Sequence, residues 1–190
     1  SDNPTDGYRT ATVSITDSGL SDNVNITPSG QQASAGAVVT IDVNPVNDQP
    51  TITDLTAVTF AENSINSTAA TLDGSVTVTD IDSADFSGGT LTVSGLNASD
   101  TVSLPASATG VAGSVERSGA DVQYRDGTAW VVVGSYTGGA GANLVVTWNS
   151  SATPAIAERV IENLTFANSA NAPVTSRTLT LALNDGDGGW

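Results

Sequence analysis

Polar and apolar residues alternate along most of this chain, in short runs that predict β-strands. Gly, Asn, Asp and Ser separate the runs, as in the pair Asp126-Gly127, and these residues favour turns. The runs are at 8–16, 37–43, 51–53, 57–60, 75–79, 90–94, 101–104, 121–124, 130–134, 144–148 and 177–183. Many short strands with turns between them are typical of an all-β sandwich.

The segment 153–164 breaks the alternation and predicts one short helix. Its apolar residues at 156, 160, 161 and 164 form a single stripe at helical spacing. Thr153 suits the N-cap position and Pro154 the first helical position. We expect this helix to pack on a sheet edge or across one end of the sandwich.

The first residues of the chain recur near its end. Residues 1–17 align without gaps on residues 169–185 at a constant offset, 169 − 1 = 168, with identities that include Arg9/Arg177 and Asp17/Asp185. A constant offset with the same alternation indicates tandem modules. The prolines Pro45 and Pro50 mark a linker between them. We therefore expect residues 1–49 to hold the C-terminal strands of a preceding repeat plus the linker, and residues 50–190 to form a module that lacks its last strand.

Charge is sparse and one-sided. Acidic residues number 20 and basic residues 5, all of them Arg, for a net charge of −15. This charge disfavours nucleic acid and anionic membranes as partners. No His, Cys or Lys is present, so we expect no enzyme activity, and no apolar run is long enough for membrane insertion. Two explanations of the charge remain: solubility in a salty extracellular setting, or neutralisation by divalent cations.

Three acidic clusters contain the oxygen ligands that Ca²⁺ prefers. Asp80 and Asp82 end a predicted strand, where a turn lets both carboxylates converge, and Asp85 is close enough to join. The segment 184–188 also follows a strand and carries two glycines, and the pair 47–48 lies in the linker. The alternative is that these residues only terminate strands and form Asx turns. The spacing does not match an EF-hand loop.

The order of these strings resembles the cadherin-like tandem repeats of large bacterial surface adhesins of the RTX type. The strings are Val46-Asn-Asp-Gln-Pro-Thr51, Phe60-Ala-Glu-Asn63, Val78-Thr-Asp-Ile-Asp-Ser83 and Leu183-Asn-Asp-Gly-Asp-Gly-Gly189. The resemblance implies a Greek-key sandwich, one bead of a calcium-rigidified stalk whose partners are neighbouring repeats. It also implies a junction ligand set of Asp48, Asp80, Asp82, Asp185 and Asp187. Glu62 matches the glutamate at the start of a repeat and would serve the opposite pole or a neighbouring junction.

The expected function is therefore a non-catalytic, calcium-binding extender module of a cell-surface or secreted adhesin, located outside the cell. The alternative is a calcium-dependent module that binds a glycan or a peptide, for which Trp130 and Tyr136 are the candidate contacts. The alternative role of these aromatic residues is core packing, which we also expect for Trp148.

A third possibility follows from the repeat. The strand at 37–43 has no counterpart after Trp190, so the second module is expected to expose an open sheet edge. The hairpin at 8–43 could fill that edge in a neighbouring chain and give a head-to-tail filament, or fold back within its own chain. The open edge could also simply reflect where the piece was cut.

Overall fold

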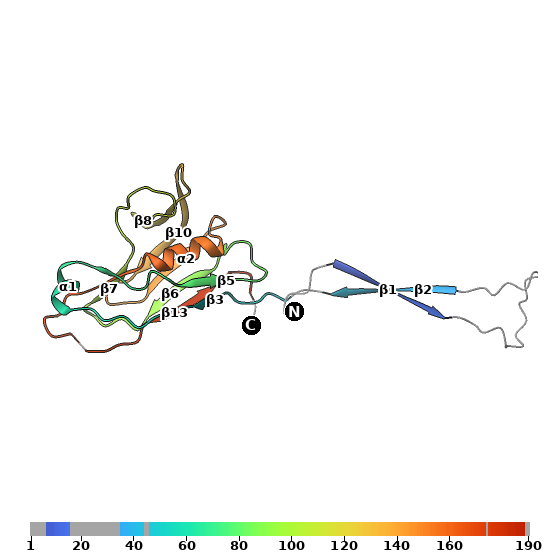
Figure 1. The fold of residues 1–190 in the computed structure, drawn as a ribbon, viewed down its shortest axis with the longest axis horizontal. Helices are drawn as coiled ribbons and strands as arrows, with labels where there is room; N and C mark the ends of the chain where they lie inside the picture. Colours follow the sequence, from blue (N-terminus) through green and yellow to red (C-terminus); the bar gives the residue numbers. More distant parts are fainter. Residues whose placement is uncertain (1–6, 16–34, 44–45, 174, 189–190) are drawn as a thin grey trace, which may run out of the picture. The chain divides into compact units, whose positions relative to one another are not determined.

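The computed structural model describes residues 7–15, 35–43, 46–173 and 175–188 (Figure 1). These residues form a mainly β structure with antiparallel sheets and two short helices. The chain divides into two units, Ser1–Val46 and Asn47–Trp190. This division falls within the segment that the two prolines mark in the sequence.

The first unit contains one antiparallel pair of strands, β1 (Gly7–Ile15) and β2 (Ala35–Val43). The pairing runs from Gly7 opposite Val43 to Ile15 opposite Ala35. Both strands were predicted from the alternation, and the structure confirms them to within two residues.

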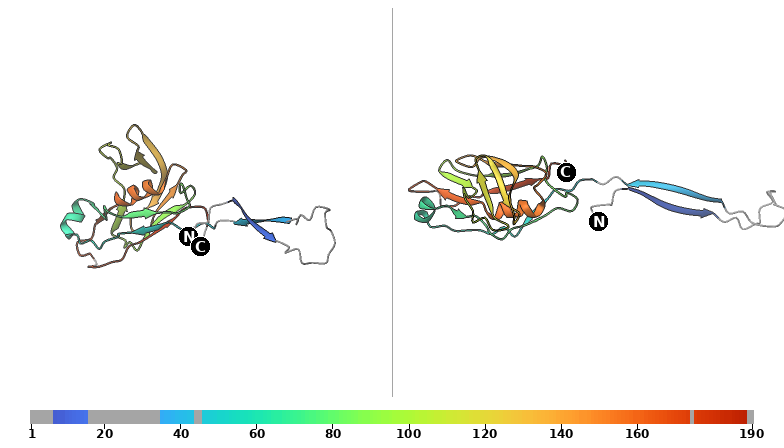
Figure 2. Two further views of the ribbon diagram at one scale, coloured as in Figure 1. Left: turned by 45° about the vertical axis from the view of Figure 1, so that its right-hand side comes forward. Right: turned by 90° about the horizontal axis from the view of Figure 1, so that it is seen from above.

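The second unit is built around a six-stranded antiparallel sheet in the order β13-β6-β11-β10-β9-β8 (Figures 1 and 2). Its strands are β6 (Thr90–Ser94), β8 (Val115–Ser118), β9 (Asp121–Arg125), β10 (Trp130–Gly138), β11 (Leu144–Trp148) and β13 (Thr180–Asn184). A three-stranded sheet has the order β4-β12-β7 and contains β4 (Ala70–Thr71), β7 (Asp100–Ser103) and β12 (Thr165–Asn168). The strands β3 (Thr51–Thr53) and β5 (Thr77–Thr79) pair with each other.

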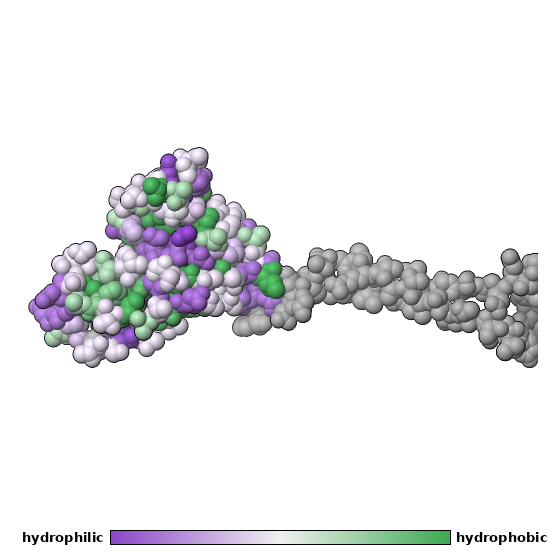
Figure 3. All heavy atoms as spheres, viewed as in Figure 1, coloured by the Kyte–Doolittle hydropathy of each residue, from purple (hydrophilic) through white to green (hydrophobic). Residues whose placement is uncertain are grey.

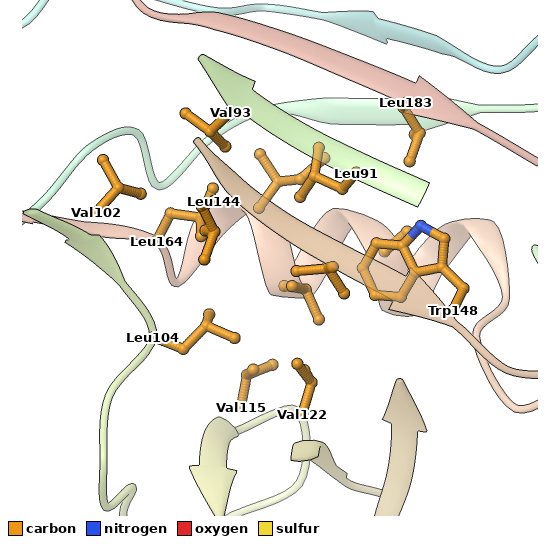
Figure 4. Packing of buried hydrophobic residues seen from close by; sticks show 14 of the residues in the cluster. Leu91, Val93, Val102, Leu104, Val115, Val122, Leu144, Trp148, Leu164 and Leu183 are labelled. Atoms are coloured by element: carbon orange, nitrogen blue, oxygen red, sulfur yellow. The ribbon is translucent and has the colours of Figure 1, made fainter. Parts of the chain in front are cut away.

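One hydrophobic core lies between these elements (Figure 4). Aliphatic side chains from the strands β6 and β11 of the large sheet meet those of the smaller sheet and of the helices. The central members are Leu91, Val93, Val102, Leu144, Val146, Val160, Ile161, Leu164 and Phe166. Trp148 is 3% exposed within this cluster, which confirms its predicted core position.

The predicted helix is confirmed as α2 (Pro154–Glu162). The Thr153 side-chain oxygen accepts a hydrogen bond from the Ile156 N–H at 3.3 Å, so Thr153 is the N-cap. The apolar stripe is buried, and the Glu158 carboxylate accepts a hydrogen bond from the Val78 N–H at 2.9 Å. This contact ties α2 to β5.

Other expectations from the sequence need correction. A second helix, α1 (Glu62–Ser67), is present where only one helix was predicted. Residues 57–60 form no strand, because no strand pairs with them among the described residues. The last strand begins at Thr180 and not at Arg177, since its partner β6 ends at Ser94, directly opposite Thr180. The strands β4, β8 and β12 were not predicted.

Candidate functional site

Three of the predicted acidic segments lie together in the second unit. The Asn47 side-chain amide donates a hydrogen bond to Asp185 Oδ2 at 2.7 Å. The Asp48 N–H donates to Asp82 Oδ2 at 3.1 Å. The linker, the loop after β5 and the loop after β13 are therefore hydrogen-bonded to one another. We refer to Asn47, Asp48, Asp80, Asp82 and Asp185 as the acidic junction.

Asp80 organises its own loop. Its Oδ1 accepts hydrogen bonds from the Asp82 N–H at 3.1 Å and the Ser83 N–H at 2.8 Å, which is an Asx turn. Its other carboxylate oxygen, Oδ2, is buried and has no hydrogen-bond partner among the described residues, and the same holds for Asp48 Oδ2. A buried carboxylate oxygen without a partner is costly, so two such atoms in one junction point to a missing ligand.

Asp185 is fully buried at 0% exposure, although it is an aspartate at the end of a strand. Besides the contact with Asn47, its Oδ1 accepts a hydrogen bond from the Asp187 N–H at 3.0 Å. The loop can fold this way because of Gly186, whose φ is 95° and whose position leaves no room for a side chain: a Cβ there would lie 2.4 Å from the Ser87 carbonyl oxygen. The glycines of the sequence motif thus serve to hold Asp185 in the junction.

The other predicted ligands are placed less closely. Asp187 is exposed, and Asp85 accepts a hydrogen bond from the Ser87 N–H at 3.0 Å in a second Asx turn. Glu62 lies in the first turn of α1, at the end of the unit away from β3 and β5 (Figures 1 and 2). Asp17 and Asp22, the acids of the earlier repeat, fall outside the described residues.

The carboxylates of the junction do not already form a metal cage. Among the described residues, no group of three or more acidic side chains is gathered tightly enough to hold a metal ion. Two of these carboxylates, those of Asp82 and Asp185, are instead joined to the linker by hydrogen bonds from Asp48 and Asn47.

Arginine does not balance the charge of the junction through ion pairs. The described residues form two ion pairs, Arg159 with Glu162 and Arg177 with Asp100, and neither includes a junction residue. Arg117 donates to the Tyr136 hydroxyl, and Arg125 donates to the Gly110 carbonyl. Four aspartates therefore share the junction without a cationic partner in these contacts.

The two aromatic candidates do not share a face of the sheet. Both lie on β10, but the register with β9 shifts between Val132 and Gly134, so one extra residue separates them. Tyr136 lies opposite the buried Val146 and packs against the core. Trp130 lies opposite Arg125, whose guanidinium is 5.9 Å from the centre of the indole ring. These placements give no common platform for a ligand.

A buried ion pair escaped the sequence reading. Asp100 is 1% exposed and accepts hydrogen bonds from the Asn97 N–H, the Asn168 amide and the Arg177 guanidinium. Burial by itself raises the pKa of Asp100, but these hydrogen bonds and the charge of Arg177 outweigh it and hold the pKa below its ordinary value of 3.8. The two residues are 77 positions apart, and no local motif signals the pair.

The second unit also carries a groove of about 950 Å³ between the segment 55–60 and the segment 171–181. Apolar side chains dominate its lining, and Leu55 and Val58 are about half exposed. Figure 3 shows hydrophobic residues gathered on the surface of this unit near α1. The groove is distinct from the acidic junction, because the two share no residue.

Comparison with protein-family models, with curated proteins and with solved structures gives no significant match. None of the helices in the described residues is long and apolar enough to cross a membrane. The functional argument therefore rests on the residues themselves.

Proposed function

We propose that this chain is a non-catalytic extender module of a bacterial cell-surface or secreted adhesin, made rigid by Ca²⁺ bound at the acidic junction. The module would link neighbouring repeats of one polypeptide outside the cell. The single observation that carries the proposal is the pair of buried, unpartnered carboxylate oxygens, Asp48 Oδ2 and Asp80 Oδ2, in a junction that joins the linker to two loops.

The fold is proposed to be a Greek-key sandwich of the cadherin-like type. Support comes from the two antiparallel sheets of three and six strands, which contribute side chains to one core. The order of the strings in the sequence, which resembles that of cadherin-like repeats, supports the same assignment.

The donor chemistry of the junction suits a hard cation. Ca²⁺ takes six to eight oxygen ligands from carboxylates, carbonyls, amides and water. Asp48, Asp80, Asp82 and Asp185 would hold the ion, and the Asn47 side-chain oxygen is a further donor. Bound Ca²⁺ supplies positive charge that offsets four aspartates, and this would replace repulsion between the linker and the two loops by attraction.

The rigidifying role follows from where the ligands lie in the chain. Asn47 and Asp48 belong to the linker, whereas the other ligands belong to loops of the second unit. A cation shared between them would fix the linker at its exit from the sandwich. Without it, three hydrogen bonds from Asn47 and Asp48 to Asp82, Ser83 and Asp185 perform this task.

The proposal is tested by substituting Asp80 and measuring Ca²⁺ binding by calorimetry. Asp126 is a matched control, since its Oδ1 also accepts hydrogen bonds from the N–H groups two and three residues ahead. Asp80→Asn and Asp126→Asn both keep the turn acceptor and remove one negative charge. We expect Asp80→Asn to weaken Ca²⁺ binding at least about tenfold, or by about 1.4 kcal/mol, and Asp126→Asn to leave it unchanged. If both variants bind Ca²⁺ as the unsubstituted chain does, Asp80 only forms a turn and the proposed site is wrong.

A further inference from the structure

We propose that the groove beside β13 accepts a β-strand, and that its occupant is the segment Ala35–Val43 of a second copy of this chain. This inference goes beyond the calcium site, and no part of it requires Ca²⁺. It rests on the unpaired edge of β13, on the register of β1 with β2, and on the apolar lining of the groove.

The edge strand β13 has β6 on one side and, in the part of the chain that the structure describes, no strand on the other. The groove runs along this region and is lined by residues that include Leu55, Val58, Phe60, Phe166, Leu179 and Leu181. An edge with free backbone groups beside an apolar channel is suited to β-strand addition.

The repeat in the sequence supplies the register of the incoming strand. Residues 7–15 correspond to residues 175–183 at the offset of 168, and residues 7–15 pair with β2 in the first unit. Transferring that pairing puts Val38 of the second copy opposite Thr180, Val39 opposite Leu179 and Ala37 opposite Leu181.

The transferred register matches the pattern of both segments. From 177 to 183 the odd-numbered residues are the less exposed ones, and Leu179 and Leu181 line the groove. Directly opposite residues of an antiparallel pair share a face. The residues that fall on the groove side are all apolar: Ala35, Ala37, Val39, Ile41 and Val43. A slip by one residue would turn this whole set to the solvent side.

The opposite wall of the groove supports the same occupant independently. Residues 57–60 have the composition of a strand, yet they form none in the structure. They lie across the groove from 175–181, so a strand inserted between the two walls would give both segments a neighbour.

The length of the linker favours a second copy over the chain's own strand. Asn47 is hydrogen-bonded to Asp185, at the C-terminal end of β13. In the transferred register Val43 lies opposite residue 175, beyond the far end of β13, which is about 17 Å away at about 3.4 Å per residue. The four residues from 43 to 47 span at most about 14 Å. A complete nine-residue pair therefore needs another molecule, and copies joined in this way form a head-to-tail chain or a ring.

Cysteine cross-linking tests the inference, because the chain has no native Cys. The variants Thr180→Cys and Val38→Cys are prepared separately and mixed under mild oxidation, so that any mixed disulfide joins two molecules. The matched control mixes Thr180→Cys with Val39→Cys, which shifts one partner by a single residue to the other face. We expect the mixed dimer, identified by peptide mapping, to form mainly in the 180/38 mixture, since opposite residues have the Cα separation that a disulfide requires.

Light scattering of the unsubstituted chain provides a second measurement that needs no variant. We expect a mass that rises above the 19.0 kDa of one chain as concentration increases, and that falls back when a synthetic peptide of residues 35–43 is added in excess. A mass of 19.0 kDa at every concentration would overturn the proposal, and so would equal cross-linking in both cysteine mixtures. Repeating both measurements in EDTA separates this result from the calcium site: assembly that persists without Ca²⁺ upholds the strand proposal even if the ion does not bind.

Discussion

At the scale of single residues, the contrast between two ion pairs shows what burial adds. Arg177 is 16% exposed at its side chain and pairs with the buried Asp100, whereas Arg159 is 53% exposed and pairs with Glu162 on the surface of α2. Breaking a buried pair strands a charge away from water, but an exposed pair is already solvated. We expect Arg177→Gln to lower the free energy of unfolding by about 3 kcal/mol and Arg159→Gln by less than about 1 kcal/mol. Urea denaturation of both variants measures this, and equal losses would contradict it.

The same aspartate makes stability depend on pH. The pKa of Asp100 in the folded chain is lower than 3.8, so its ionised form stabilises the fold above the unfolded pKa, and this contribution is lost as pH falls through the folded pKa. We therefore expect Asp100→Asn to be clearly less stable than the unsubstituted chain at pH 7. The difference should shrink at pH 3 and below. Urea midpoints at both pH values test this, and a difference independent of pH would count against it.

At the scale of elements, α2 shows that a helix with complete local signals can be predicted. Thr153, Pro154 and the apolar stripe are all read from the sequence, and the structure uses each of them. The helix α1 was missed because Ala61 at its N-cap makes no side-chain capping bond and only Ile65 is buried. The strand at 57–60 was predicted wrongly for a different reason: alternation reports the preference of a segment, but a strand also needs a neighbour.

The capping bond of α2 yields a prediction of its own. Replacing Thr153 by Ala removes the acceptor for the Ile156 N–H, so we expect the free energy of unfolding to fall by about 1 kcal/mol. Thr153→Ser keeps the oxygen and should change stability by only a few tenths of that. Chemical denaturation of the pair isolates the hydrogen bond. A loss in Thr153→Ser as large as in Thr153→Ala would mean that the methyl group, and not the cap, matters.

At the scale of the whole molecule, the candidate site was only partly predictable. The resemblance to cadherin-like repeats brought Asp48, Asp80, Asp82 and Asp185 together, and the structure places all four in one hydrogen-bonded junction. The bulge in β10 that separates Trp130 from Tyr136 gives no signal in the sequence. Long-range pairing, such as that of Asp100 with Arg177, depends on which strands become neighbours, and alternation alone does not contain that information.

The central claim is that Ca²⁺ binds the folded chain at the acidic junction and stabilises it. Thermal unfolding of the full chain in excess CaCl₂ and in EDTA, at one ionic strength, tests this most directly. Ca²⁺ at about 100 times its Kd would add about 2.7 kcal/mol, and for a domain of this size Tm should rise by roughly 5–10 °C. Asp80→Asn should lose most of that rise and Asp126→Asn should keep it. A Tm that is the same in CaCl₂ and in EDTA would contradict the account.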